Sequence, residues 1–252
     1  MFWSPLTRRV AFWLTWCTVV IGIGHLFLHV DQKAIEDRFG LHYTRWLDMN
    51  AEQSVATWFN VGLLQLAAAL AVLGAIAVAT RRQRIAWSAL ATAIFLLSLD
   101  EKISIHEALP SLLGMDQGDL VTHEWLIPGV AVALTALLVL VPLLRPLPRP
   151  LVVGLLLAMV VYGSGAVGVE LVSGAAVRTL DIEHPLRQLM PVWEWVEESL
   201  EMLGCILAIT ALLRHLERMR VVDVARWRQL GRQARRPVRP APRAAGSLSR
   251  HR

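Results

Sequence analysis

Cysteine is scarce in this chain of 252 residues, which contains only Cys17 and Cys205. Both lie inside apolar stretches, so the sequence offers neither a disulfide framework nor a Cys-x-x-Cys metal motif. The chain also has no Glu-x-x-His pair, no His-Glu-x-x-His motif and no glycine-rich phosphate loop ending in Gly-Lys. No serine or cysteine nucleophile lies beside a base. These absences exclude the enzyme classes that such motifs define.

Polar residues are too few to cover a soluble protein of this length, since 55% of the residues are hydrophobic. The apolar residues form blocks of about the 20 residues that a helix needs to cross ~30 Å of hydrocarbon. Such blocks occur at residues 10–30, 55–79, 85–109, 123–144, 151–177 and 192–214. We therefore expect an all-α integral membrane protein, with a bundle of six transmembrane helices over residues 1–220.

Arginine is concentrated in a few places, although the net charge is only +5. Arginines precede the first block, recur in the connections near residues 81–84 and 145–149, and are dense in 221–252, whereas the 110–122 connection has no Lys or Arg. Under the positive-inside rule, this distribution predicts that both termini lie in the cytoplasm. We expect a cell-membrane protein, and the Arg- and Ala-rich composition favours a bacterial inner membrane. The Arg- and Pro-rich segment 221–252 is expected to be a disordered tail that contacts anionic lipid. We expect membrane lipids, and no nucleic acid, as partners.

Ionisable residues inside membrane helices are costly unless they are paired, hydrated or bound to metal, and this sequence has many of them. In the predicted topology, neighbouring helices run in opposite directions. The ionisable residues of these helices nevertheless lie at one depth in the membrane, toward the outer ends of the helices. That shared depth predicts a His/carboxylate metal site in the outer half of the bundle. The candidate ligands are His25, His29, Asp100, His106, Glu107, His123, Glu170, Glu194, Glu198 and Glu201.

A divalent metal ion is the simplest partner for these residues, because the mutual repulsion of the carboxylates needs a counter-charge. Mixed imidazole and carboxylate ligands suit Zn, Fe, Mn or Cu, among which the residues do not distinguish. Some acidic residues have another interpretation. Glu194 and Glu198 begin a helix, where negative charge is favoured by the helix dipole, and Glu101 is expected to be solvated.

Three classes of function fit such a site. In the first, a metal-dependent membrane enzyme, such as a hydrolase or oxidase, acts on a lipid or another amphiphile, with Glu107 or Glu201 as general base. The second is a metal-ion or proton transporter, which predicts that polar residues continue toward the cytoplasmic side, where the sequence is mostly apolar. The third is a haem protein, which leaves the carboxylates unexplained; a subunit of a membrane complex is a further alternative. The sequence slightly favours the enzyme over the transporter.

Overall fold

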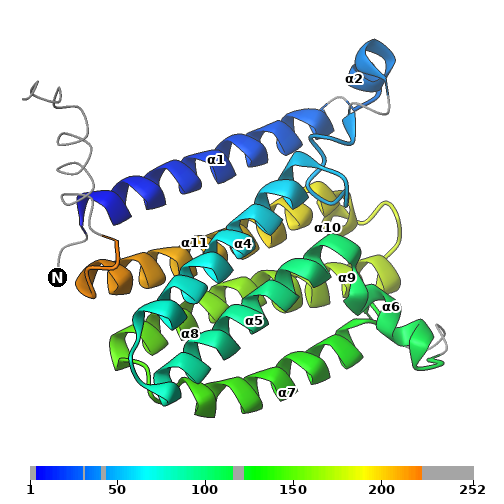
Figure 1. Cartoon of the computed structure of the whole chain (residues 1–252). Helices are drawn as coiled ribbons and strands as arrows, with labels where there is room; N and C mark the ends of the chain where they lie inside the picture. Colours follow the sequence, from blue (N-terminus) through cyan, green and yellow to red (C-terminus); the bar gives the residue numbers. More distant parts are fainter. Residues whose placement is uncertain (1–3, 31, 41–43, 116–121, 223–252) are drawn as a thin grey trace, which may run out of the picture.

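The computed structural model describes residues 4–30, 32–40, 44–115 and 122–222, and within these ranges it contains helices and connections but no strand (Figure 1). The 223–252 segment, predicted to be a disordered tail, lies outside the described residues. The long helices are α1 (Pro5–Val30), α4 (Val55–Ala77), α5 (Arg81–Ile103), α7 (Leu126–Leu144), α8 (Arg149–Gly163) and α11 (Met190–Arg218). The shorter helical elements are α2 (Gln32–Phe39), α6 (Ile105–Leu112), the π-helix η1 (Ser164–Val169), α9 (Glu170–Thr179) and α10 (Pro185–Gln188).

The all-helical architecture predicted from the sequence is confirmed, and four of its helical stretches have the length and composition of membrane spans. These are α1, α4, α7 and the continuous stretch from Arg149 to Thr179. The large apolar side chains on the outside of the bundle agree with a lipid environment, for example Ile76 at 74% exposed and Leu138 at 76% exposed. The apolar helices therefore indicate a membrane protein.

The two ends of the bundle differ in what they hold (Figure 1). The short helices α2, α6 and α10 gather at one end, which we call the loop end. The first and last described helices meet at the opposite end, which we call the terminal end, where the Ser4 hydroxyl donates a hydrogen bond to the Glu217 carboxylate at 2.7 Å. The Thr7 hydroxyl donates to the other Glu217 oxygen at 2.9 Å.

Close packing around α11 depends on glycine. A Cβ atom on Gly204 would lie 2.7 Å from both the backbone nitrogen and the Cβ of Tyr162, so the missing side chain lets α8 approach α11. Gly74 of α4 has the same role against Trp87 of α5, whose ring would lie 2.5 Å from an added Cβ. Trp87 is 1% exposed. These contacts place α4, α5, α8 and α11 close enough for their polar side chains to meet.

Three predicted helices differ in detail from the structure. The 85–109 block is broken at Ser104, which adopts a left-handed conformation with φ of 48° and separates α5 from α6. The 151–177 block contains the π-turn η1, which rotates the residues that follow it. The 123–144 block begins its helix at Leu126, with Pro128 in the first turn, where a missing N–H costs no hydrogen bond. His123 and Glu124 therefore lie in the connection before α7.

Candidate metal centre

Three glutamates meet between α5 and α11. Glu101, Glu198 and Glu201 each offer a carboxylate oxygen, and these oxygens lie within 4.8 Å of one another. We call these residues the carboxylate trio. Glu201 is buried, and Glu198 lies one turn before it on the same helix. The trio therefore places three acidic groups in a part of the bundle that water reaches poorly.

Neutral hydrogen-bond donors hold the trio in place. The Asn60 amide, fully buried in α4, donates to Glu101 at 3.0 Å and to Glu201 at 3.3 Å. The Tyr162 hydroxyl donates to the second oxygen of Glu101 at 3.2 Å. The Cys205 thiol donates to the Asn60 carbonyl oxygen at 3.5 Å and fixes the orientation of the amide. Neutral donors orient carboxylates without supplying the positive charge that they need.

The trio lacks a side-chain cation among the described residues. No lysine or arginine in the described ranges forms a salt bridge with these carboxylates, and the Lys102 amine instead donates to the Glu52 backbone oxygen at 3.3 Å. The Oε2 atom of Glu198 is buried and has no hydrogen-bond partner in this part of the chain. Buried carboxylates in this state need either protons or a metal cation.

A second group contains His25 and His29 of α1 and Glu194 of α11, with ligand atoms within 4.8 Å of one another. His25 is fully buried, and both of its ring nitrogens are already engaged. The Met49 backbone N–H donates to Nδ1 at 3.0 Å, and Nε2 donates to the Pro191 carbonyl at 2.9 Å. This pattern defines a neutral imidazole that joins α1, the 44–54 connection and α11. His25 consequently has no nitrogen to offer a metal without breaking a hydrogen bond to the backbone.

His29 differs from His25 in this respect. Its Nδ1 lies 3.0 Å from the His25 carbonyl oxygen, which can only accept, so Nδ1 is the donor and Nε2 carries the lone pair. Glu194 lies close to His25, with 3.8 Å between the Glu194 carboxylate and Nε2 of His25. Within this group, His29 and Glu194 are therefore the residues better suited to hold a cation.

Glu170 lies in a third polar cluster, close to residues before α7. The Trp125 indole N–H donates to Glu170 at 3.2 Å, and Nε2 of His123 lies 3.5 Å from the same oxygen. Gly174 makes this approach possible, since an added Cβ would lie 2.4 Å from the His123 ring. The Glu197 side chain of α11 lies close to Glu170. Glu170 therefore faces protein.

Asp100 and His106 form a pair across the break between α5 and α6. The carboxylate accepts from the His106 backbone N–H at 2.9 Å and lies 3.0 Å from Nδ1 of the ring. Burial lowers the pKa of His106, but the hydrogen bond to Asp100 and the negative charges of Asp100 and Glu107 outweigh it. The pKa of His106 therefore lies above its usual 6.5. Asp100 thus serves as a cap for α6 as well as an ion-pair partner. Glu107 is exposed on α6.

The ten candidate ligands do not meet in one site within the described residues. The structure brings Glu198 and Glu201 together, places His25, His29 and Glu194 in a second group, His123 with Glu170 in a third, and Asp100 with His106 in a fourth. Glu107 joins none of these groups. Sequence reasoning missed Glu101, Asn60 and Tyr162, which complete the surroundings of the trio.

A family model described as Domain of unknown function (DUF8692) matches residues 8–216 of the chain, which include every helix that contributes to these groups. No curated protein matches the chain, and no solved structure matches it.

Proposed function

The chain belongs to the DUF8692 family, a domain of unknown function, and from its geometry we propose that it is a six-span membrane protein that binds a divalent metal ion at the carboxylate trio. The observation that carries this proposal is the unpartnered, buried Oε2 atom of Glu198 beside Glu101 and Glu201. One buried and two half-buried acidic groups, without a salt bridge to a lysine or arginine among the described residues, gain most from a doubly charged cation. Removing such a cation leaves charges that cost several kcal/mol each.

The donor atoms of the trio favour a hard cation. The three carboxylates supply oxygen ligands, which suit Mg²⁺, Ca²⁺ and Mn²⁺. Of the metals predicted from the sequence, this set favours Mn²⁺, because Zn²⁺ and Cu²⁺ prefer nitrogen or sulfur ligands. The imidazole groups that suggested those metals lie in other clusters.

The six-span topology adds α5 and α11 to the four apolar helices. At 1.5 Å per residue, the 23 residues of α5 extend about 35 Å and the 29 residues of α11 about 44 Å, against ~30 Å of hydrocarbon. In this proposal, six spans bring both termini to one side, and the positive-inside rule, applied to the arginine distribution, favours the cytoplasm as that side.

The surroundings of the trio favour access from one side. Between the trio and the terminal end, the buried positions of α11 are mostly apolar, with Ile206, Ile209 and Leu212 at 4% exposed or less. The hydroxyl of Thr210, which is also buried, donates to the Leu207 backbone oxygen of the same helix at 2.9 Å. A transporter needs a polar route through this layer, whereas a metal-dependent enzyme needs access only from the loop end. We therefore retain an enzyme that acts on a lipid or another amphiphile, with Glu201 beside the metal as the general base. Glu107 is less suited to that role, since it is exposed on α6.

Manganese binding tests the metal proposal. We would measure Mn²⁺ binding to the full chain, purified in detergent and stripped of metal, by electron paramagnetic resonance. The native protein is expected to bind about one ion per chain, and Glu198→Gln and Glu201→Gln to weaken binding by at least about tenfold, the equivalent of ~1.4 kcal/mol. Glu183→Gln, which removes an exposed acidic residue after α9, is the matched control and should bind like the native chain.

The glutamine variants keep the size of the side chain and one oxygen, so a folded variant is expected. An elution volume equal to that of the native protein checks this. If Mn²⁺, Mg²⁺ and Ca²⁺ all fail to bind the native protein, the metal proposal is wrong, and protons compensate the trio.

A further inference from the structure

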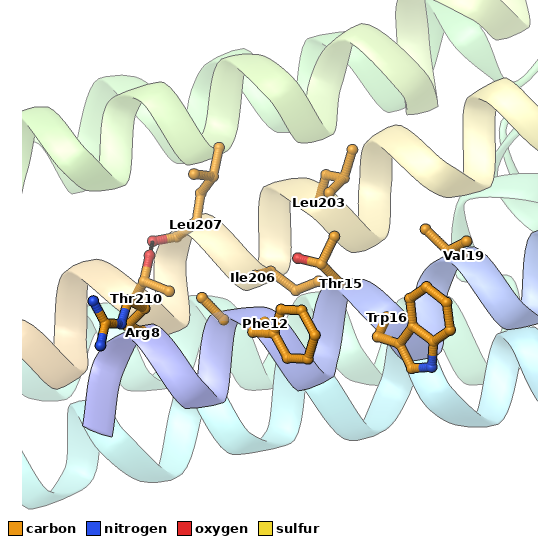
Figure 2. Close-up of a pocket in the computed structure, with 10 residues that line it drawn as sticks. Arg8, Phe12, Thr15, Trp16, Val19, Leu203, Ile206, Leu207 and Thr210 are labelled. Atoms are coloured by element: carbon orange, nitrogen blue, oxygen red, sulfur yellow. Dashed lines mark hydrogen bonds between the residues drawn. The ribbon is translucent and has the colours of Figure 1, made fainter. Parts of the chain in front are cut away.

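An apolar groove runs between α1 and α11 on the outside of the bundle, away from every polar cluster described above. Its volume is about 350 Å³. Figure 2 shows Phe12 and Trp16 of α1 and Leu203 and Leu207 of α11 around it, with Arg8 and Thr210 together at one end. That end is the terminal end of the bundle, because Arg8 follows Thr7, which is hydrogen-bonded to Glu217.

Cationic side chains lie where the groove reaches the terminal end. Arg8 lines the groove itself. Arg214 follows Thr210 by four residues and Leu207 by seven, so it continues the groove-lining face of α11 by one turn. Its Nη2 atom is buried and has no hydrogen-bond partner among the described residues. The nearby Glu217 carboxylate accepts hydrogen bonds from Ser4 and Thr7, which partly satisfy it.

We propose that this groove binds one anionic phospholipid from the leaflet at the terminal end, with an acyl chain along the groove and the phosphate at Arg8 and Arg214. From Arg8 to Val19 the groove follows α1 for about 16 Å, a length that an extended acyl chain can occupy. Arginine binds phosphate through paired N–H donors, and a guanidinium beside an apolar groove matches a lipid with a charged headgroup. Membrane lipid is also the molecule that surrounds this face if the helices span the bilayer.

Native mass spectrometry tests this proposal. The full chain is delipidated in detergent and then titrated with phosphatidylglycerol or with phosphatidylcholine of the same acyl chains. The first phosphatidylglycerol is expected to bind several-fold more tightly than phosphatidylcholine. Arg8→Gln should weaken its binding about fivefold, as expected for one charge near a headgroup, and the Arg8→Gln/Arg214→Gln variant should weaken it further.

Matched variants separate the groove from the basic tail and from charge in general. Arg235→Gln/Arg236→Gln removes two arginines from the tail and should leave binding of the first lipid unchanged. Thr15→Phe fills the groove and should weaken binding, whereas Val20→Phe, at an exposed α1 position that does not line it, should not.

The proposal is overturned if the two lipids bind equally, or if the tail variant loses as much affinity as Arg8→Gln. It is also overturned if a photo-crosslinker at Trp16 captures a second copy of the chain instead of lipid. Because the readout is lipid mass, its failure is distinguishable from a failure of the manganese experiment.

Discussion

His25 shows how a residue that suggests a metal ligand in the sequence can have a different role in the fold. Its ring nitrogens bind Met49 and Pro191, from two separate parts of the chain. We predict that His25→Ala lowers the free energy of unfolding by about 2–4 kcal/mol, since it empties a buried site and leaves two backbone groups unpaired. Thermal unfolding of the purified protein measures this loss.

Metal binding supplies the control for His25. Mn²⁺ affinity of the carboxylate trio should be unchanged in His25→Ala molecules that remain folded, because His25 belongs to another group. The companion variant His29→Ala should destabilise the protein less, as its ring makes one hydrogen bond to the preceding turn. Equal destabilisation by both variants would contradict the proposal that the two hydrogen bonds of His25 to the backbone stabilise the fold.

His106 gives the protein a predictable dependence on pH. Its pKa is raised in the folded state, so its ion pair with Asp100 stabilises the fold fully below pH 6.5, the usual histidine value. That contribution is lost as pH rises through the higher folded value. We expect the difference in Tm between the native protein and His106→Gln to be largest below pH 6.5 and to shrink above it.

Several neighbouring groups affect the pKa of His106, and one of them provides the control variant. Asp100, Glu107 and Glu101 all raise the pKa of His106, and the Trp125 ring packs against it with 4.5 Å between ring centroids. Asp100→Asn should remove most of the pH dependence in the native background. A difference in Tm that instead grows above pH 6.5 would show that the His106 pKa is lowered.

At the scale of helices, glycine controls the approach of α8 to α11. Gly204→Ala would place a Cβ atom 2.7 Å from the Tyr162 backbone nitrogen and 2.8 Å from the Ala158 carbonyl oxygen, both of which are fixed in α8. We expect a loss of about 1–3 kcal/mol of stability from overpacking and weaker metal binding, since displaced Tyr162 no longer donates to Glu101.

Gly62 of α4 is the matched control for Gly204. It also lies in a helix, and an added Cβ would meet nothing within 4 Å. Gly62→Ala should therefore be neutral or slightly stabilising, because alanine favours helix more than glycine does. The two alanine variants should differ clearly in Tm; a similar Tm for both would mean that α8 can move away from α11 without cost.

The bounds of the helices were predictable from the sequence where they follow the apolar residues. They were less predictable where interactions with the backbone end one helix and begin the next. The break at Ser104 depends on the Asp100 side chain capping the next helix, an alternative that the apolar pattern of 85–109 does not contain. Glu101 was expected to be solvated, although it lies eleven residues after Leu90 and thus on the same buried face of α5. That periodicity could have identified Glu101; its partners Asn60 and Tyr162 could not be identified, because they depend on how separate helices pack.

At the scale of the whole molecule, charge placement identifies which ends of the helices lie together. The candidate ligands come near the loop end in α1, α5 and α11, as the alternating direction of the helices predicts, but side-chain packing divides them into separate groups. The direction of a helix determines how deep in the membrane its polar residues lie. Which of the residues at one depth contact each other depends on the rotation of each helix about its axis. A single-residue change of phase, such as the π-turn η1 before Glu170, is enough to separate potential ligands.

The six-span arrangement makes a prediction about which connections face which side. Six crossings place the α9–α11 connection opposite the α7–α8 connection and put both termini on the side of the α7–α8 connection. Loss of α5 as a span would move the N-terminus to the other side, and loss of α11 would move the C-terminus. We would place single cysteines at the exposed residues Glu183 and Pro146, in a Cys17→Ser background, and label intact cells with a membrane-impermeant thiol reagent. Glu183→Cys should be labelled directly and Pro146→Cys only after the membrane is permeabilised. A cysteine at Arg9, predicted to lie on the same side as Pro146, should behave like Pro146→Cys; labelling of Arg9→Cys but not of Pro146→Cys in intact cells would mean that α5 does not cross.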